Sequence, residues 1–83
     1  MDRASDGDVL RRVRLAWLSA LTAYVRAAKR HDETAALQTQ NGHPELARRA
    51  SKRAAEERAG YDAALARHPE WAEHAPPWTK VGV

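Results

Sequence analysis

The fold is decided by five residues in the middle of the chain, Gln40-Asn41-Gly42-His43-Pro44. Asn and Gly adopt positive φ at little cost, and Pro is favoured at the first position of a helix, so this segment is typical of a turn that leads into a helix. The sequences on either side of it are rich in Ala, Arg, Leu and Glu, which are strong helix formers. We therefore predict two long helices, at residues 5–38 and 44–67, joined by a turn at residues 39–43.

The composition indicates a single small all-α domain that spans residues 1–83. Ala accounts for 18 of the 83 residues, whereas Phe and Ile are absent. Strands favour alternating β-branched and aromatic residues, and the chain contains no such run. The formal net charge is +3, and there is no Cys, which excludes disulfide bonds, thiolate zinc sites and Cys nucleophiles.

An apolar stripe runs along the first predicted helix. At 100° per residue, Leu10, Val13 and Leu21 fall within about 60° of Trp17. A single helix that carries this stripe over its whole length is the expected arrangement. A break near His31-Asp32 stays open as an alternative, since Asp32 is a residue type that caps the start of a new helical segment.

The short turn makes the two long helices antiparallel neighbours, in an Ala-rich hairpin that resembles a coiled coil. With the turn centred near residue 41, residue i is expected to face roughly residue 82 − i. Trp17 then meets Leu65, and Leu21 meets Tyr61. Toward the turn both helices present Ala, and small residues allow two helices to approach closely.

The C-terminal part of the chain is expected to leave the hairpin at Pro69, because the residue before Pro avoids the helical conformation. A short third helix is predicted at residues 69–74, and the tail at residues 75–83 is expected to be extended because it contains Pro76-Pro77. Two roles stay open for Trp78 in this tail. Either it closes the open end of the hairpin over Trp17 and Leu10, or it docks on a partner.

The segment Leu15–Val25 is apolar almost all round, which is typical of a helix buried on several sides. A two-helix unit of this size has a small core, so we expect dimerisation into a four-helix bundle or docking on a larger protein to complete it. The alternative is that the third helix and Trp78 fold back over the segment. The predicted function is a non-catalytic protein–protein interaction module, a small helical adaptor or accessory subunit. Its predicted protein-binding residues are Leu15, Trp17, Leu18, Leu21, Val25, Trp71 and Trp78.

Basic residues gather near the turn end of the predicted hairpin and give an alternative function, a small nucleic-acid-binding regulator. The pairing rule brings six cations together there, and such patches attract phosphate backbones. No aromatic residue lies among them for base stacking. These residues are Lys29, Arg30, Arg48, Arg49, Lys52 and Arg53.

Glu57 falls inside the apolar stripe of the second helix, about 40° from Tyr61. Ala-rich helices slide past one another at little cost, so some feature has to fix their register. We expect Glu57 to be partly buried and to do this, through a hydrogen bond to Tyr24 or an ion pair with Arg26.

Catalysis, cofactors and metal ions are not expected. The chain has no nucleophile motif, Gly-rich phosphate loop or paired-carboxylate cleft. His68, Glu70 and His74 have a spacing that metal sites use, but three side chains on one terminal turn usually face solvent.

The protein is expected to be cytoplasmic, with no membrane association. The apolar segment Leu15–Val25 follows Arg11, Arg12 and Arg14, as in a signal peptide. Acidic residues precede these arginines, however, and the helical stripe continues past the segment. The segment is also shorter than the roughly 20 apolar residues that a membrane span needs.

Overall fold

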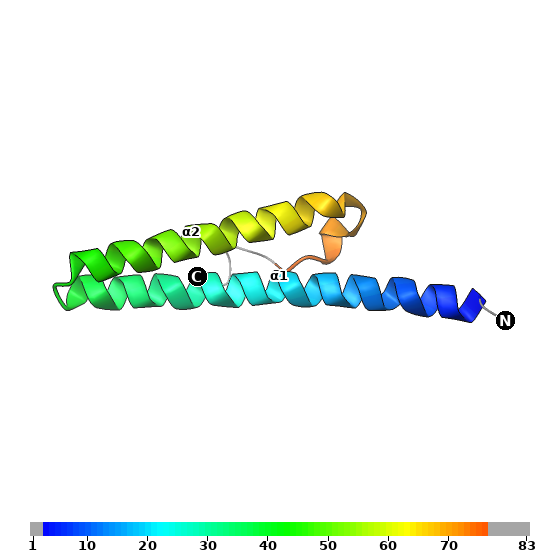
Figure 1. Ribbon diagram of the computed structural model, residues 1–83, viewed down its shortest axis with the longest axis horizontal. Helices are drawn as coiled ribbons and strands as arrows, with labels where there is room; N and C mark the ends of the chain where they lie inside the picture. Colours follow the sequence, from blue (N-terminus) through cyan, green and yellow to red (C-terminus); the bar gives the residue numbers. More distant parts are fainter. Residues whose placement is uncertain (1–2, 77–83) are drawn as a thin grey trace.

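The computed structural model describes the backbone of residues 3–76 and the side chains of residues 7–76. Two long helices lie antiparallel, α1 at Arg3–Gln40 and α2 at Pro44–Arg67, and a short 3₁₀ helix, η1, follows at Pro69–His74 (Figure 1). No strand occurs between residues 3 and 76. The predicted all-α hairpin with a short third helix is therefore confirmed. The predicted extended tail lies mostly outside the described residues.

The turn between α1 and α2 forms a glycine cap of the Schellman type. The His43 N–H donates to the Gln38 carbonyl at 2.8 Å, the Gly42 N–H donates to the Thr39 carbonyl at 3.1 Å, and Gly42 has φ +77°. Glycine adopts this left-handed conformation without the steric cost that a Cβ would add. The cap lets α1 continue two residues further than the sequence predicted, so the turn is confined to residues 41–43.

The helix α1 is continuous from Arg3 to Gln40, so the break considered near His31-Asp32 does not occur. Asp32 acts instead in the tertiary structure, where its carboxylate forms an exposed ion pair with Arg58 of α2. The pair joins the two helices, although an exposed ion pair contributes little to stability.

The core lies between α1 and α2 and changes in character along the hairpin. At the open end it contains Trp17, Leu21, Val25 and Tyr61, of which Leu21 is fully buried. Toward the turn the buried residues are all alanines, and they are Ala28, Ala47, Ala50 and Ala54. Bulky residues at the open end and small ones near the turn match the sequence-based prediction.

Tyr24 of α1 and Gly60 of α2 make a close contact between the two helices. A Cβ built on Gly60 would lie 2.5 Å from a ring carbon of Tyr24, which is closer than real Cβ atoms come to their neighbours. The hairpin is centred on Gly42, midway between Gln40 and Pro44. Residue i therefore faces roughly residue 84 − i, two residues later than predicted.

The open end of the hairpin is closed by η1, which folds back toward α1 (Figure 1). Trp71 and Ala75 pack against the core, and the Tyr61 hydroxyl donates a 2.7 Å hydrogen bond to the Pro76 carbonyl. This is the arrangement expected if the third helix covers the apolar part of α1.

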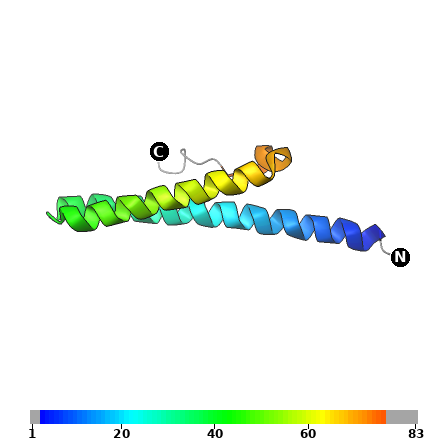
Figure 2. The ribbon, with the colours of Figure 1, turned by 45° about the horizontal axis from the view of Figure 1, so that its top comes forward.

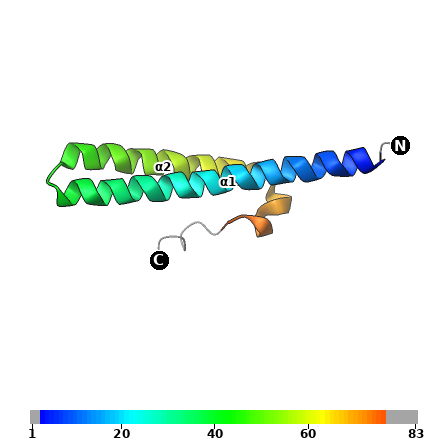
Figure 3. The same cartoon turned by 90° about the horizontal axis from the view of Figure 1, so that it is seen from below.

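The N-terminal part of α1 extends beyond α2, because α1 has 38 residues and α2 has 24. Trp17 lies near the end of α2, where its indole N–H bonds to the Ala64 carbonyl. Residues 3–16, which we call the overhang, have no helix beside them in any of the three ribbon views (Figures 1, 2 and 3). Leu10 and Val13 belong to the predicted stripe but are 58% and 46% exposed.

We predict that Gly60→Ala lowers the free energy of unfolding, because the added methyl group displaces the Tyr24 ring. At a helix interior position, Ala is otherwise about 1 kcal/mol more favourable than Gly. In a Tyr24→Ala background the same substitution should therefore raise the free energy of unfolding. The measurement is urea denaturation followed by circular dichroism, on all four chains of this double-mutant cycle. An equal effect of Gly60→Ala in both backgrounds would contradict the proposed contact.

Candidate interaction surface

The predicted protein-binding residues divide into those used inside the chain and those left on its surface. Trp17, Leu21 and Val25 are buried between α1 and α2. Leu18 and Trp71 are partly buried and pack against the same core. Leu15 is 56% exposed, and Trp78 lies outside the described residues.

Trp17 is the centre of an aromatic cluster at the open end. Its indole N–H donates a 2.7 Å hydrogen bond to the Ala64 carbonyl, so the polar edge of the buried ring is satisfied. Trp71 meets the Trp17 ring edge-on, with ring centroids 5.5 Å apart, and His68 stacks on Trp71 at 4.1 Å. Edge-on and stacked contacts each add about 0.5–1.5 kcal/mol to the burial of the rings.

His68 also contacts Glu70, with its Nδ1 3.0 Å from a carboxylate oxygen. The hydrogen bond to His68 lowers the pKa of Glu70 below its usual range, and a backbone hydrogen bond acts in the same direction. The cluster is thus an intramolecular closure of the hairpin. It uses Trp17 and Trp71 within the chain, so these two side chains are not available to a partner in this structure.

The overhang presents the apolar side chains that the hairpin leaves open. Val9, Leu10 and Val13 lie at roughly −80°, +20° and −40° around the helix relative to Trp17. They are therefore on the side of α1 that faces α2 from Trp17 onward. They are 46–58% exposed. We call these three residues the overhang face. Leu15 is equally exposed but lies roughly 160° from Trp17, on the opposite side of α1.

The sequence predicted only part of the overhang face. The predicted stripe includes Leu10 and Val13, and the residue expected as one alternative to close over Leu10, Trp78, lies outside the described residues. The signal that could have shown the exposure of Leu10 and Val13 is the difference in length between the predicted helices, 5–38 and 44–67. A hairpin that pairs from the turn outward leaves the start of the longer helix without a partner.

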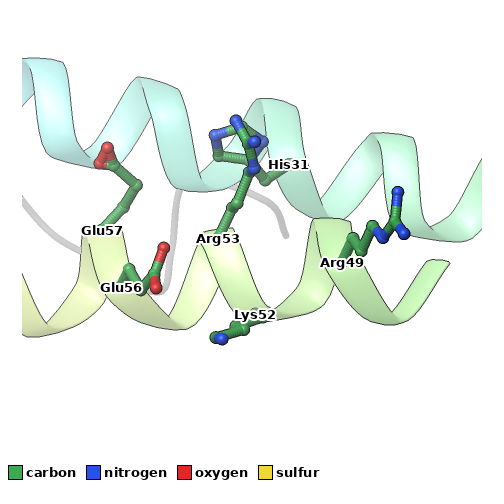
Figure 4. A pocket seen from close by; sticks show the side chains of 6 residues that line it. All are labelled: His31, Arg49, Lys52, Arg53, Glu56 and Glu57. Carbon is green, nitrogen blue, oxygen red and sulfur yellow. The ribbon is translucent and has the colours of Figure 1, made fainter. Parts of the chain in front are cut away.

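The six predicted nucleic-acid-binding cations are all exposed, but the structure does not gather them into one site. Three of them, Arg49, Lys52 and Arg53, line a shallow hollow of about 400 Å³ (Figure 4). The lining also includes His31 of α1 and two carboxylates. Lys29, Arg30 and Arg48 lie outside this lining, and Arg48 is ion-paired with Glu45.

The two carboxylates in the hollow belong to Glu56 and Glu57. Glu57 is partly buried, as expected, and points from α2 toward α1 (Figure 4). Among the side chains described between residues 7 and 76, neither Tyr24 nor Arg26 is bonded to it. The Tyr24 ring instead packs closely against Gly60, a glycine that the sequence analysis did not single out.

Within the described part of the chain, no group of three or more His, Asp and Glu residues is placed to hold a metal ion. Of the helices between residues 3 and 76, none combines the length and the apolar character needed to cross a membrane. Comparison with protein-family models, with curated proteins and with solved structures found no match for this chain.

We predict that Tyr61→Phe lowers the free energy of unfolding by about 1 kcal/mol at pH 7, because it removes the hydrogen bond to the Pro76 carbonyl. Burial, and secondarily the charge of Asp62, raises the pKa of Tyr61 above 10. The folded chain thus retains a proton that the unfolded chain loses, so the contribution of Tyr61 to stability is complete below about pH 10 and declines as the pH rises further.

The measurement is urea denaturation at several pH values between 7 and 11. Stability should fall less steeply above pH 10 in the Tyr61→Phe chain than in the unmodified chain. Parallel curves for the two chains would show that the ionisation of Tyr61 is not linked to folding.

Proposed function

We propose that this protein is a non-catalytic protein–protein interaction module, a small helical adaptor or accessory subunit that binds through α1. The observation that carries the proposal is the overhang face, where Val9, Leu10 and Val13 are half-exposed on a part of α1 that no other helix between residues 3 and 76 covers. An apolar helical face that folding leaves open is a usual feature of helix-mediated recognition.

The hairpin supports this function by holding the overhang as a helix. An isolated helix of about 14 residues is only marginally stable in water. The overhang is instead the continuation of a helix whose remaining length is packed against α2 through Trp17, Leu21 and Val25. A partner therefore meets a surface that is already ordered, which reduces the conformational entropy lost on binding.

The absence of catalysis is part of the same proposal. Tyr61 and Glu70 have shifted pKa values, but Tyr61 is bonded to Pro76 and Glu70 is bonded to His68. Burial and the charge of Asp62 account for the raised pKa of Tyr61, and the hydrogen bond to His68 accounts first for the lowered pKa of Glu70. Neither residue lines the hollow around His31, which is shallow and mixed in charge.

Nucleic-acid binding is the second candidate, and it rests on Arg49, Lys52 and Arg53 around one hollow. Glu56 and Glu57 in the same hollow oppose the approach of a phosphate. An affinity for duplex DNA or RNA that falls steeply with salt, and that is lost on Arg49→Glu and Arg53→Glu, would favour this candidate.

We predict that Leu10→Asp abolishes association of the chain, because it places a charge in a contact that binding desolvates. Leu15→Asp is the matched control, since Leu15 has the same size and exposure but lies on the opposite side of α1. Both positions are exposed, so we expect the free energy of unfolding to change by less than about 0.5 kcal/mol in either variant.

Association is measured in two ways, by light scattering over a concentration series and by retention of proteins from an extract of the source cells on the immobilised chain. The proposal requires at least one association that Leu10→Asp removes and Leu15→Asp keeps. A chain that stays monomeric, and that retains nothing in a Leu10-dependent way, would overturn it. Leu18 is not suitable for this test, because it packs against the core within the chain.

A further inference from the structure

We propose that the hollow around His31, between α1 and α2, binds a small zwitterion: a phosphate ester that carries an ammonium group nearby. The hollow lies on the flank of the hairpin and shares no residue with the overhang. The inference therefore goes beyond the proposed function and does not depend on it. Three observations support it: donors from both helices converge on the hollow, a carboxylate lies one turn away from them, and these charges are not paired with one another.

The hollow lies where the two helices meet through alanine. Ala28 of α1 and Ala54 of α2 are fully buried in this contact. His31 lies one turn after Ala28, and Arg53 directly precedes Ala54. Longer side chains thus stand beside a contact made of small ones, and the space between them is the hollow of about 400 Å³.

Nitrogen donors from both helices converge on this space. The Arg53 side chain extends from α2 to His31 of α1, and Arg49 extends toward α1 one turn further along (Figure 4). A phosphate suits these donors, because its terminal oxygens share the negative charge and accept paired hydrogen bonds from a guanidinium group. An imidazole N–H donates to the same oxygens whether or not the ring is protonated.

The carboxylate of Glu57 lies one turn beyond Arg53. It is partly buried and points from α2 toward α1 (Figure 4). Four residues separate the two positions, which is about 6 Å along the helix axis. A bare phosphate meets this carboxylate as a like charge. An ammonium group joined to the phosphate through two carbons spans the distance, and the carboxylate then contributes to binding.

The charges around the hollow are not neutralised within the described part of the chain. Between residues 7 and 76, no ion pair includes any of the six side chains that line it. Arg53 and Glu57 have the spacing at which pairs form on a helix, but both point toward α1 instead (Figure 4). Arg48 and Glu45 of the same helix are paired. A zwitterion can therefore meet both charges without breaking an existing pair.

Lys52 provides a matched control for Arg53. It lies about 100° from Arg53 around α2, and its ammonium group points away from His31 (Figure 4). Lys52→Gln and Arg53→Gln remove the same charge from neighbouring exposed positions. A difference between these variants thus reports the hollow and not the net charge of the chain. Substitutions at exposed positions have little effect on folding, which circular dichroism verifies.

The experiment titrates the isotopically labelled full chain with phosphoethanolamine, inorganic phosphate or ethanolamine, and NMR follows the signals of His31, Arg53 and Glu57. The ionic strength is low and constant, because salt screens exposed charges. We expect phosphoethanolamine to bind roughly threefold more tightly than phosphate, the gain from one partly exposed ion pair, and ethanolamine alone to bind more weakly than either.

The variants locate the two charges of the ligand. Arg53→Gln should weaken binding of phosphoethanolamine about fivefold, and Lys52→Gln less than about twofold. Glu57→Gln should abolish the preference for phosphoethanolamine over phosphate. Phosphate that binds the unmodified chain as tightly as phosphoethanolamine would overturn the proposal. Equal losses in Arg53→Gln and Lys52→Gln, or unchanged signals at about 50 mM phosphoethanolamine, would also overturn it.

A second arm distinguishes a soluble ester from a lipid headgroup with the same chemistry. The chain is sedimented with phosphatidylcholine vesicles that contain phosphatidylethanolamine. Vesicle binding that Arg53→Gln reduces and Lys52→Gln retains would assign the ligand to a lipid headgroup. A chain that binds phosphoethanolamine but does not sediment with the vesicles would assign it to a soluble ester.

Discussion

The ring of Tyr24 lies so close to Gly60 that no larger residue fits there without a shift, and we infer that this contact fixes the position of the two helices along one another. Between Ala28 and Ala54 the two helices meet through small side chains, and neighbouring registers of an Ala-lined contact differ little in energy. The Tyr24 ring removes this degeneracy, because it fits only opposite a residue without a side chain. Between the core alanines of α2 and Tyr61, Gly60 is the one such residue. With Tyr24 set opposite Gly60, α2 ends opposite Trp17.

The energetics of the hairpin are concentrated at its open end. Trp17, Leu21, Val25 and Tyr61 supply the large buried side chains, whereas an Ala contact buries little apolar area per residue. The hydrogen bond from the Trp17 indole to the Ala64 carbonyl and the contacts of Trp71 and His68 reinforce the same region. The turn end is held mainly by its glycine cap and by the continuity of two long helices. Local opening is therefore expected to begin near the turn rather than at the aromatic cluster.

Helix type, helix order and the turn could be predicted from the sequence, because Ala-rich periodicity, Gly42 and Pro44 act locally. The identity of the core residues followed from the same periodicity. The register did not follow, since the pairing rule assumed a turn centred on residue 41, whereas the glycine cap extends α1 to Gln40 and moves the centre to Gly42. Glu57 was predicted to be bonded to Tyr24 or Arg26, and it is bonded to neither. The close contact of Tyr24 with Gly60 was not predicted, because a missing side chain leaves no periodic signal in a sequence.

The exposed overhang is a consequence of where Pro69 stands in the chain. By the register of the hairpin, residue 74 is the one that would lie opposite Leu10, so a helix extended through residues 69–74 would cover the overhang face. Pro69 stops α2 because the residue before it, His68, leaves the helical conformation, with φ −136° and ψ 67°. Those six residues form η1 and close over Trp17, which covers the largest ring of α1. The segment that could have covered Leu10 and Val13 therefore covers Trp17 instead. Leu10 and Val13 stay exposed, and a second molecule can bind them.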